Sequence, residues 1–275
     1  MDELFLGDVE LDVAFQPIVD LETFRPFGYE VLGRARSRAR GVVHRPDHLL
    51  ELAHARGTLL RLDRAWRALA ISRIAAATVP GELRWFFNVD SRCIDDPEHT
   101  SGFTRATLEA AGLNDLQVVI ELGERDPLLD ATRLARLVPS YAQQGFAIAL
   151  DDLGAGHASL NRLVELRPDV AKLDMKLVRG IDADAYRLAL LRSLVRFADE
   201  VGMILIVEGI ETAAELTAVR RLGVAFGQGY LLGRPRELPE AWRGPMRSHE
   251  AGISGTFPTG TASAVSDARV LERGA

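Results

Sequence analysis

The chain has 275 residues, of which 47% are hydrophobic, so it can build the core of one large domain or two small ones. Its 39 acidic against 33 basic residues give a net charge of −6, which argues against binding DNA or RNA duplexes, because that needs clustered lysine and arginine. Cys93 is the one cysteine, which excludes an internal disulfide and fits a reducing cytoplasm. With no long apolar stretch and an acidic start, we expect no membrane association and no signal peptide.

Short apolar runs predict eight β-strands along the chain. In chain order they cover residues 12–19, 27–34, 84–90, 117–122, 146–152, 169–174, 203–209 and 224–231. Helical spacing of apolar residues predicts helices at 46–55, 59–77, 126–145, 184–202 and 212–223. The last three of these helices end in glycine, a common helix stop.

The order of these elements predicts an α/β fold. From residue 84 onward strands and helices alternate, which implies parallel strands with helical crossovers. Eight such strands favour a TIM-like (β/α)8 barrel over an open sheet, since no glycine-rich dinucleotide motif follows an early strand. The first two strands are joined by the short segment DLETFRP, too short for a crossover helix. We therefore expect an irregular barrel whose first strand is antiparallel.

The domain organisation follows from composition. Residues 1–243 are expected to form a single barrel domain. Residues 244–275 are rich in Gly, Ser, Thr and Ala without a sustained period, which predicts a disordered tail.

The strand at 146–152 ends in two adjacent carboxylates, Asp151 and Asp152. Like charges side by side repel each other, and burial increases the cost. One explanation is that one aspartate caps the following helix while the other is solvated. The other is that a divalent cation lies between them.

Polar residues at the carboxyl ends of the other predicted strands favour the explanation that a divalent cation lies between Asp151 and Asp152. A barrel builds its sites at this end of its strands. The polar positions there are Glu30, Asn88, Glu121, Asp151, Asp152, Lys172, Glu208, with Glu211 just after it, and Gln228. Oxygen ligands suit Mg²⁺ or Mn²⁺ rather than Zn²⁺, and no closely spaced histidine pair appears. A pair of such ions can activate water and stabilise a leaving oxygen in phosphodiester cleavage.

Eight motifs, in order across residues 12–243, resemble the EAL family of cyclic di-GMP phosphodiesterases. The segment EVLGR at 30–34 looks like the Glu-Ala-Leu signature that names the family. The others are FQPIVDL, FFNVD, VVIELGE, ALDDLGAGHASL, DVAKLD, IVEGIET and GQGYLLGRP. The resemblance implies a TIM-like barrel that opens cyclic di-GMP to linear pGpG with two Mg²⁺ or Mn²⁺ ions. It also implies a homodimer and a possible regulatory partner protein.

The resemblance also implies roles for individual residues. Glu30, Asn88, Glu121 and Asp151 correspond to the ligands of one metal ion, and Asp151, Asp152 and Glu208 to those of the second. Lys172 corresponds to the lysine that orients or deprotonates the attacking water, supported by Glu211 and Gln228. Arg34 corresponds to a phosphate-binding arginine, and Gln16 and Leu32 are expected to contact the substrate. Glu124 corresponds to a glutamate that braces the loop after the aspartate pair.

The sequence departs from the family pattern in places. Val31 replaces the signature alanine, and the loop after Asp152 carries His157 and Ala158 where hydroxyl residues are usual. These changes bear on loop ordering and activation rather than on metal binding. Two other hypotheses stay open: a non-catalytic cyclic di-GMP receptor on the same fold, and a barrel acting on a different phosphodiester or phosphosugar.

Overall fold

The computed structural model describes residues 9–37, 43–77, 82–123, 131–155 and 159–238. The expected tail at 244–275, with Glu124, His157 and Ala158, lies outside these described residues. No helix among them is long and apolar enough to cross a membrane.

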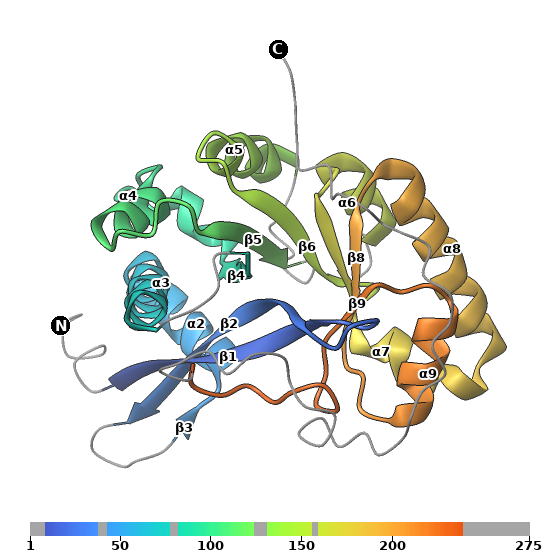
Figure 1. The fold of residues 1–275 in the computed structure, drawn as a ribbon. Helices are drawn as coiled ribbons and strands as arrows, with labels where there is room; N and C mark the ends of the chain where they lie inside the picture. The colour runs from blue at the N-terminus through green and yellow to red at the C-terminus, as the bar shows by residue number, and fades with distance from the viewer. Residues whose placement is uncertain (1–8, 38–42, 78–81, 124–130, 156–158, 239–275) are drawn as a thin grey trace.

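The described chain alternates strands and helices from β4 onward (Figure 1). The strands are β1 (Val9–Asp20), β2 (Pro26–Ser37), β3 (Val43–His44), β4 (Arg84–Val89), β5 (Gln117–Gly123), β6 (Ala147–Leu153), β7 (Val170–Leu173), β8 (Ile204–Val207) and β9 (Phe226–Gly227). The helices are α2 (Pro46–Ala55), α3 (Leu59–Ala76), α4 (Phe103–Ala110), α5 (Ala131–Ala142), α6 (Ser159–Leu166), α7 (Met175–Val178), α8 (Ala185–Val201) and α9 (Ala213–Arg221). Two short 3-10 helices, η1 (Ser91–Asp95) and η2 (Ile181–Ala183), complete the set of described elements.

The strands close into a barrel. Around it the order is β1-β9-β8-β7-β6-β5-β4-β2, and β2 pairs back with β1, while β3 adds a short edge pairing to the end of β2. Strand β1 runs antiparallel to both of its neighbours, β2 and β9. The other neighbouring pairs around the barrel, from β2–β4 through to β8–β9, are parallel. Helices surround the strands, with α3 and α4 on one side of the view and α8 and α9 on the other (Figure 1). The predicted TIM-like barrel with an antiparallel first strand is therefore confirmed.

The helix predictions differ from the structure mainly where helices are short. Helix α2 covers the predicted 46–55, and α8 stops at Gly202, which takes the left-handed conformation. Helix α5 starts at Ala131, inside the predicted 126–145. The sequence prediction missed α4, α6 and α7, because eight residues or fewer carry too little of a 3.6-residue period to stand out.

The barrel interior is filled by one small apolar layer. Its buried members are Ile18, Phe86, Val119, Ala149, Val170 and Ile206. A larger cluster packs the helices against the outside of the strands. Since side chains alternate along a strand, the residue two positions beyond each interior residue faces the interior again, one layer closer to the carboxyl ends.

Candidate active site

The second interior layer is polar, and its members are the residues predicted from the strand ends. Two positions beyond the apolar layer stand Asn88, Glu121, Asp151, Lys172, Glu208 and Gln228. The register agrees, because Asn88 is paired with Glu121 between β4 and β5. Because side chains alternate between the two faces of a strand, one residue from each of these strands faces the interior at the same level. Together these residues form one ring of functional groups.

Lys172 lies at the centre of this ring and is fully buried. Its Nζ atom is 2.8 Å from Glu121 Oε1 and 2.8 Å from Glu208 Oε1. It is also 3.1 Å from Asp151 Oδ1 and 3.2 Å from Glu30 Oε2. Four carboxyl groups thus share one ammonium group.

Glu30 is held by two side-chain amides as well. Asn88 Nδ2 donates to its Oε1 at 3.1 Å, and Gln228 Nε2 donates to its Oε2 at 2.6 Å. Burial alone would raise the pKa of Glu30, but Lys172 and the two amides together hold that pKa below its ordinary value. Glu30 is therefore a carboxylate at neutral pH.

The other carboxyl groups are less well compensated. Burial raises the pKa of Glu121 well above its ordinary value, against the pull of Lys172. Burial likewise raises the pKa of Glu208 to about 8, and Asp151 and Glu30 add to the shift. For Lys172 burial would lower the pKa, but the surrounding carboxylates raise it well above the usual lysine range, so the group is an ammonium.

Asp151 and Asp152 are adjacent on β6, yet both line the same cleft. Asp151 faces the ring, so simple alternation would turn Asp152 to the opposite face of β6. Asp152 instead has a φ of 59°, in the left-handed region, and the pairing of β6 with β7 shifts register between Leu150 and Leu153. This local irregularity keeps Asp152 on the lining of the same cleft as Asp151.

A cleft of about 620 Å³ opens over the ring. That volume is typical of small-molecule sites. Its lining includes the predicted Glu30, Leu32, Arg34, Asn88, Asp151 and Asp152. Arg34 Nη1 donates to Gly33 O at 2.9 Å, and Trp66 on α3 donates from Nε1 to Arg34 O at 2.9 Å. Helix α3 thus fixes the backbone that presents the arginine.

Two other predicted residues occupy different places. Glu211 does not reach Lys172: its carboxylate is 38% exposed and pairs with Arg179, Oε1 to Nη2, at 2.8 Å. Gln16 on β1 pairs in register with Glu30 and donates from Nε2 to Gly233 O at 3.2 Å. The structure describes neither with a contact to the cleft, so their roles stay predictions.

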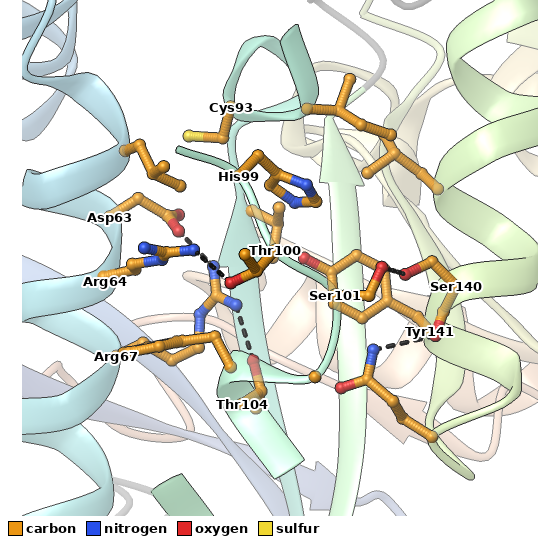
Figure 2. Close-up of a pocket in the computed structure, with 17 residues that line it drawn as sticks. Asp63, Arg64, Arg67, Cys93, His99, Thr100, Ser101, Thr104, Ser140 and Tyr141 are labelled. Carbon is orange, nitrogen blue, oxygen red and sulfur yellow. Dashed lines mark hydrogen bonds and ion pairs between the residues drawn. The ribbon is translucent and has the colours of Figure 1, made fainter. Parts of the chain in front are cut away.

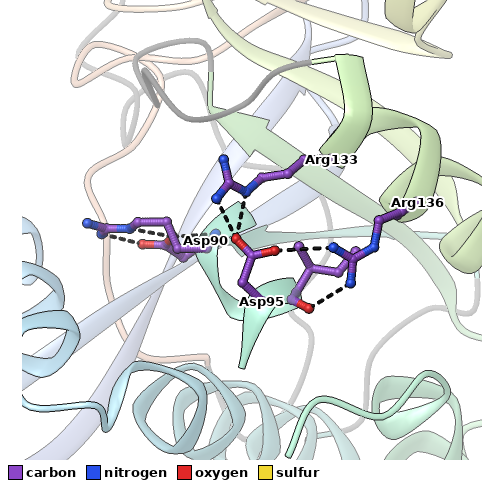
Figure 3. A network of polar contacts seen from close by, with 6 residues as sticks. Asp90, Asp95, Arg133 and Arg136 are labelled. Atoms are coloured by element: carbon purple, nitrogen blue, oxygen red, sulfur yellow. Dashed lines mark hydrogen bonds and ion pairs between the residues drawn. The ribbon is translucent and has the colours of Figure 1, made fainter. Parts of the chain in front are cut away.

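Sequence reasoning missed the charged wall of the cleft that follows β4. Arg92 donates to both carboxylate oxygens of Asp90, at 2.9 and 2.7 Å, and to Glu51 Oε1 at 2.9 Å. Asp90 also caps η1 through the backbone N–H of Arg92. Beside it, Asp95 pairs with Arg133 and Arg136 on α5 (Figure 3). The only signal in the sequence was an aspartate ending a strand, which does not specify a partner.

A second polar cavity lies outside the barrel, between α3, α4 and α5 (Figure 2). It contains the buried ion pair of Asp63 and Arg67, and Arg67 Nη1 donates to Thr104 Oγ1 at 2.6 Å. Its volume of about 20 Å³ suits roughly one water molecule. The cleft at the strand ends is therefore the candidate active site.

The acidic ring with its buried lysine lies at the carboxyl end of the strands of a (β/α)8 barrel, the end at which barrel enzymes build their sites. The family model described as EAL domain matches residues 4–235. The chain belongs to the EAL domain family.

Similar proteins agree with this membership. The probable cyclic di-GMP phosphodiesterase PdeN of Escherichia coli is 30% identical over 83% of this chain and 44% of its own length. The cyclic di-GMP phosphodiesterase PdeL of the same organism is 27% identical over 84% of this chain and 64% of its own. The chain spans about half the length of several curated relatives it matches.

Solved structures share the fold. BlrP1 of Klebsiella pneumoniae, in a complex with calcium and cyclic di-GMP, is 27% identical with a TM-score of 0.71, over 82% of this chain and 56% of that chain. Its manganese complex with cyclic di-GMP gives 26% identity and a TM-score of 0.72 over the same shares, 82% and 56%. A standalone EAL protein from Vibrio cholerae, with cyclic di-GMP bound, has 24% identity and a TM-score of 0.70 over 90% and 99%, which shows the fold alone.

Proposed function

We propose that this chain is a metal-dependent phosphodiesterase that hydrolyses cyclic di-GMP to linear pGpG. The observation that carries the proposal is the ring of four carboxylates around Lys172, beneath a cleft lined by Arg34. The relatives named as cyclic di-GMP phosphodiesterases, and the BlrP1 complexes with cyclic di-GMP, support the choice of substrate.

The residues fit divalent cations. One ammonium faces four carboxyl groups, and although Oε1 of the fully buried Glu121 pairs with Lys172, its Oε2 has no hydrogen-bond partner among the described residues. All the groups are oxygen donors, which favours Mg²⁺ or Mn²⁺. Such ions would supply charge stabilisation and an activated water. The residues that would hold them are Glu30, Asn88, Glu121 and Asp151 for one ion, and Asp151, Asp152 and Glu208 for the other.

The chain's own residues contribute binding, orientation and charge. Arg34 offers a planar guanidinium that matches a phosphodiester anion. Lys172, as an ammonium, donates hydrogen bonds that orient an attacking water and stabilise developing negative charge, but it cannot accept the water's proton in that state. In the reaction the water oxygen bonds to phosphorus, the bond from phosphorus to the 3′ oxygen breaks, and a proton passes to that oxygen.

One observation favours a non-catalytic receptor as the second candidate. Within the described parts of the chain, no three carboxylate, histidine or cysteine side chains are arranged to hold one metal ion. The carboxylates converge on Lys172 instead. A receptor would use the same cleft and Arg34 to bind the dinucleotide without turning it over.

The deciding experiment measures binding and turnover together. The protein is incubated with cyclic di-GMP and Mn²⁺ or Mg²⁺, the products are resolved by chromatography, and the dissociation constant is measured at the same ionic strength. The enzyme is expected to form pGpG. Micromolar binding with no product from the wild-type protein would establish the receptor.

A variant tests the second metal position. Asp152→Asn keeps the shape of the side chain but removes one charge, so turnover should fall by roughly 10²–10³, the usual effect of losing one transition-state stabiliser. Binding of cyclic di-GMP should persist, because Arg34 and the cleft walls are unchanged. Full turnover in Asp152→Asn would rule out this role for the carboxylate.

The assembly of the protein is a further part of the proposal. The family resemblance supports a homodimer and a regulatory partner in the cytoplasm. Sedimentation at several concentrations, with and without cyclic di-GMP, measures the dimer directly. A monomer under all conditions would contradict it.

A further inference from the structure

One buried carboxylate joins two loops at the rim of the candidate active site. Glu215, on α9, is 4% exposed. Its Oε1 accepts the backbone N–H of Gly180 at 2.8 Å. Its Oε2 accepts the backbone N–H groups of Glu211 and Thr212, both at 3.0 Å. Gly180 follows β7 and α7, whereas Glu211 and Thr212 follow β8, so a single side chain ties together the loops of neighbouring strands.

The charge on Glu215 is stabilised by these bonds. Burial alone would raise its pKa, but the three backbone N–H groups, with the hydroxyl of Thr212, hold the pKa below its ordinary value. Backbone N–H groups only donate, so this position needs a side chain with two acceptor oxygens. A glutamine would keep one acceptor and turn an NH₂ group toward at least one donor.

The loop that Glu215 holds carries part of the acidic ring. It begins at Glu208, whose Oε1 is 2.8 Å from Lys172 Nζ, and it reaches Glu211 three residues later. Ile210 in its middle donates to Gln228 O at 3.1 Å and accepts from Leu231 N at 3.1 Å. Gly229 lies so close that an added Cβ would stand 2.1 Å from Ile210 O. The loop is thus fixed at its middle by the β9 segment and at its end by Glu215.

Another link between the same loops is weaker. Arg179 and Glu211 form an ion pair, but their side chains are 56% and 38% exposed. Exposed ion pairs contribute little, because water screens them. Glu215 is the buried link.

Helix capping accounts for only part of this arrangement. Thr212 and Glu215 form a capping box at the start of α9, in which Thr212 Oγ1 accepts from Glu215 N at 3.2 Å. A capping box requires the bond from Glu215 to Thr212 N, but not those to Glu211 N and Gly180 N. We propose that Glu215 is a positioning residue that sets the Glu208–Glu211 loop for cation binding. The proposal rests on the proposed function of the acidic ring.

The test compares Glu215→Gln with two control variants. Thr212→Ala removes the capping hydroxyl but keeps the bonds of Glu215 to the two loops. Asp169→Asn alters a carboxylate that accepts Ile148 N at 2.9 Å, at the opposite end of the barrel. For each variant the affinity for Mn²⁺ alone is measured by electron paramagnetic resonance or calorimetry, together with the melting temperature and with kcat and KM for cyclic di-GMP.

Glu215→Gln is expected to weaken Mn²⁺ binding by about 10–100-fold, the usual effect of losing a group that orients metal ligands. Its kcat should fall while KM for cyclic di-GMP stays within about twofold, because the walls of the cleft are untouched. Both controls should lower the melting temperature without changing Mn²⁺ affinity. If Glu215→Gln does not fold, Glu215→Asp keeps the charge but retracts it by one methylene, and it should show an intermediate loss of Mn²⁺ affinity.

Two outcomes separate this proposal from the proposed function. Wild-type Mn²⁺ affinity in a folded Glu215→Gln or Glu215→Asp protein, with only the melting temperature lowered, would reduce Glu215 to a helix cap. A wild-type protein that binds Mn²⁺ but never cleaves cyclic di-GMP would overturn the phosphodiesterase, while the comparison of Mn²⁺ affinities would still support or overturn the role of Glu215.

Discussion

At the scale of single residues, the dominant feature is an excess of buried carboxyl groups over cationic groups. Glu30, Glu121, Asp151 and Glu208 all contact the one ammonium of Lys172. Burying charges costs free energy unless each is paired and hydrogen-bonded. This ring therefore destabilises the cation-free protein, which is a common consequence of building a site for ligands.

Glu121→Gln tests that cost. Because Glu121 is fully buried and its pKa is raised, the folded state keeps a proton that the unfolded state releases, so replacing the carboxyl group should stabilise the cation-free protein by about 1.4 kcal/mol for each pH unit between 4.5 and the folded-state pKa. A raised folded-state pKa means that stability is lost as pH rises above the unfolded value of 4.5, so the advantage of the variant should grow toward neutral pH. Denaturant unfolding in a chelator measures it. A less stable variant at every pH would contradict the argument.

His99 gives a pH effect of opposite sign. Burial, with the nearby Arg64, Arg67 and Arg136, lowers its pKa below 6.5. The folded state then binds fewer protons than the unfolded state, so stability should fall as pH drops through 6.5. His99→Asn should flatten this slope, whereas His48→Asn, at an exposed position on α2, should not. Thermal unfolding between pH 7.5 and 5.5 measures the slope, and parallel curves for wild type and His99→Asn would exclude the contribution.

At the scale of elements, the site depends on how closely the strands pack. An added Cβ at Gly28 on β2 would lie 2.4 Å from Arg84 O on β4. That contact is to backbone, which cannot move aside without separating the two parallel strands. The same pair of strands carries Glu30 and Asn88, so their separation sets a wall of the ring.

Two alanine substitutions should therefore have opposite effects on stability. Gly28→Ala should destabilise the protein by about 1–3 kcal/mol through overpacking. Gly123→Ala on β5 meets no atom of the described residues within 4 Å and needs no left-handed backbone, so it should be neutral or stabilise by about 0.4–1 kcal/mol. Chemical unfolding of both variants checks the difference. Equal losses would mean that the β2–β4 contact relaxes easily.

At the scale of the whole molecule, the proposed cation binding would be linked to folding. Any ion that binds the folded ring and not the unfolded chain adds stability by mass action, about 1.4 kcal/mol for each tenfold rise in concentration above its dissociation constant. In a domain of this size, 1 kcal/mol shifts the melting temperature by roughly 2–4 °C.

Mn²⁺, Mg²⁺ and Ca²⁺ should all raise the melting temperature, but only the first two should support turnover. Ca²⁺ takes the same oxygen ligands with longer and looser geometry, so it can fill the ring without holding the reacting groups in place. Melting curves and product chromatography with each ion check the prediction. Equal rates with Ca²⁺ and Mg²⁺ would count against a compact two-metal arrangement.

The sequence by itself determined the barrel and most of the ring. Alternating strands and helices, with one connection too short for a crossover, leave few topologies open. Polar residues at strand ends then collect at one end of any such barrel, which is why Glu121, Lys172 and Glu208 could be named in advance.

Only the tertiary structure decided how these groups are used. Strand periodicity turns Asp152 away from the ring, and a local irregularity in β6 returns it to the cleft. The pairing of Arg92 with Asp90 and Glu51, and the exposed pairing of Glu211 with Arg179, depend on side-chain directions that no period encodes. The Thr212-x-x-Glu215 pattern could predict a helix cap. The bond between Glu215 and Gly180 joins residues that are 35 positions apart in the sequence, and only the folded structure brings them together.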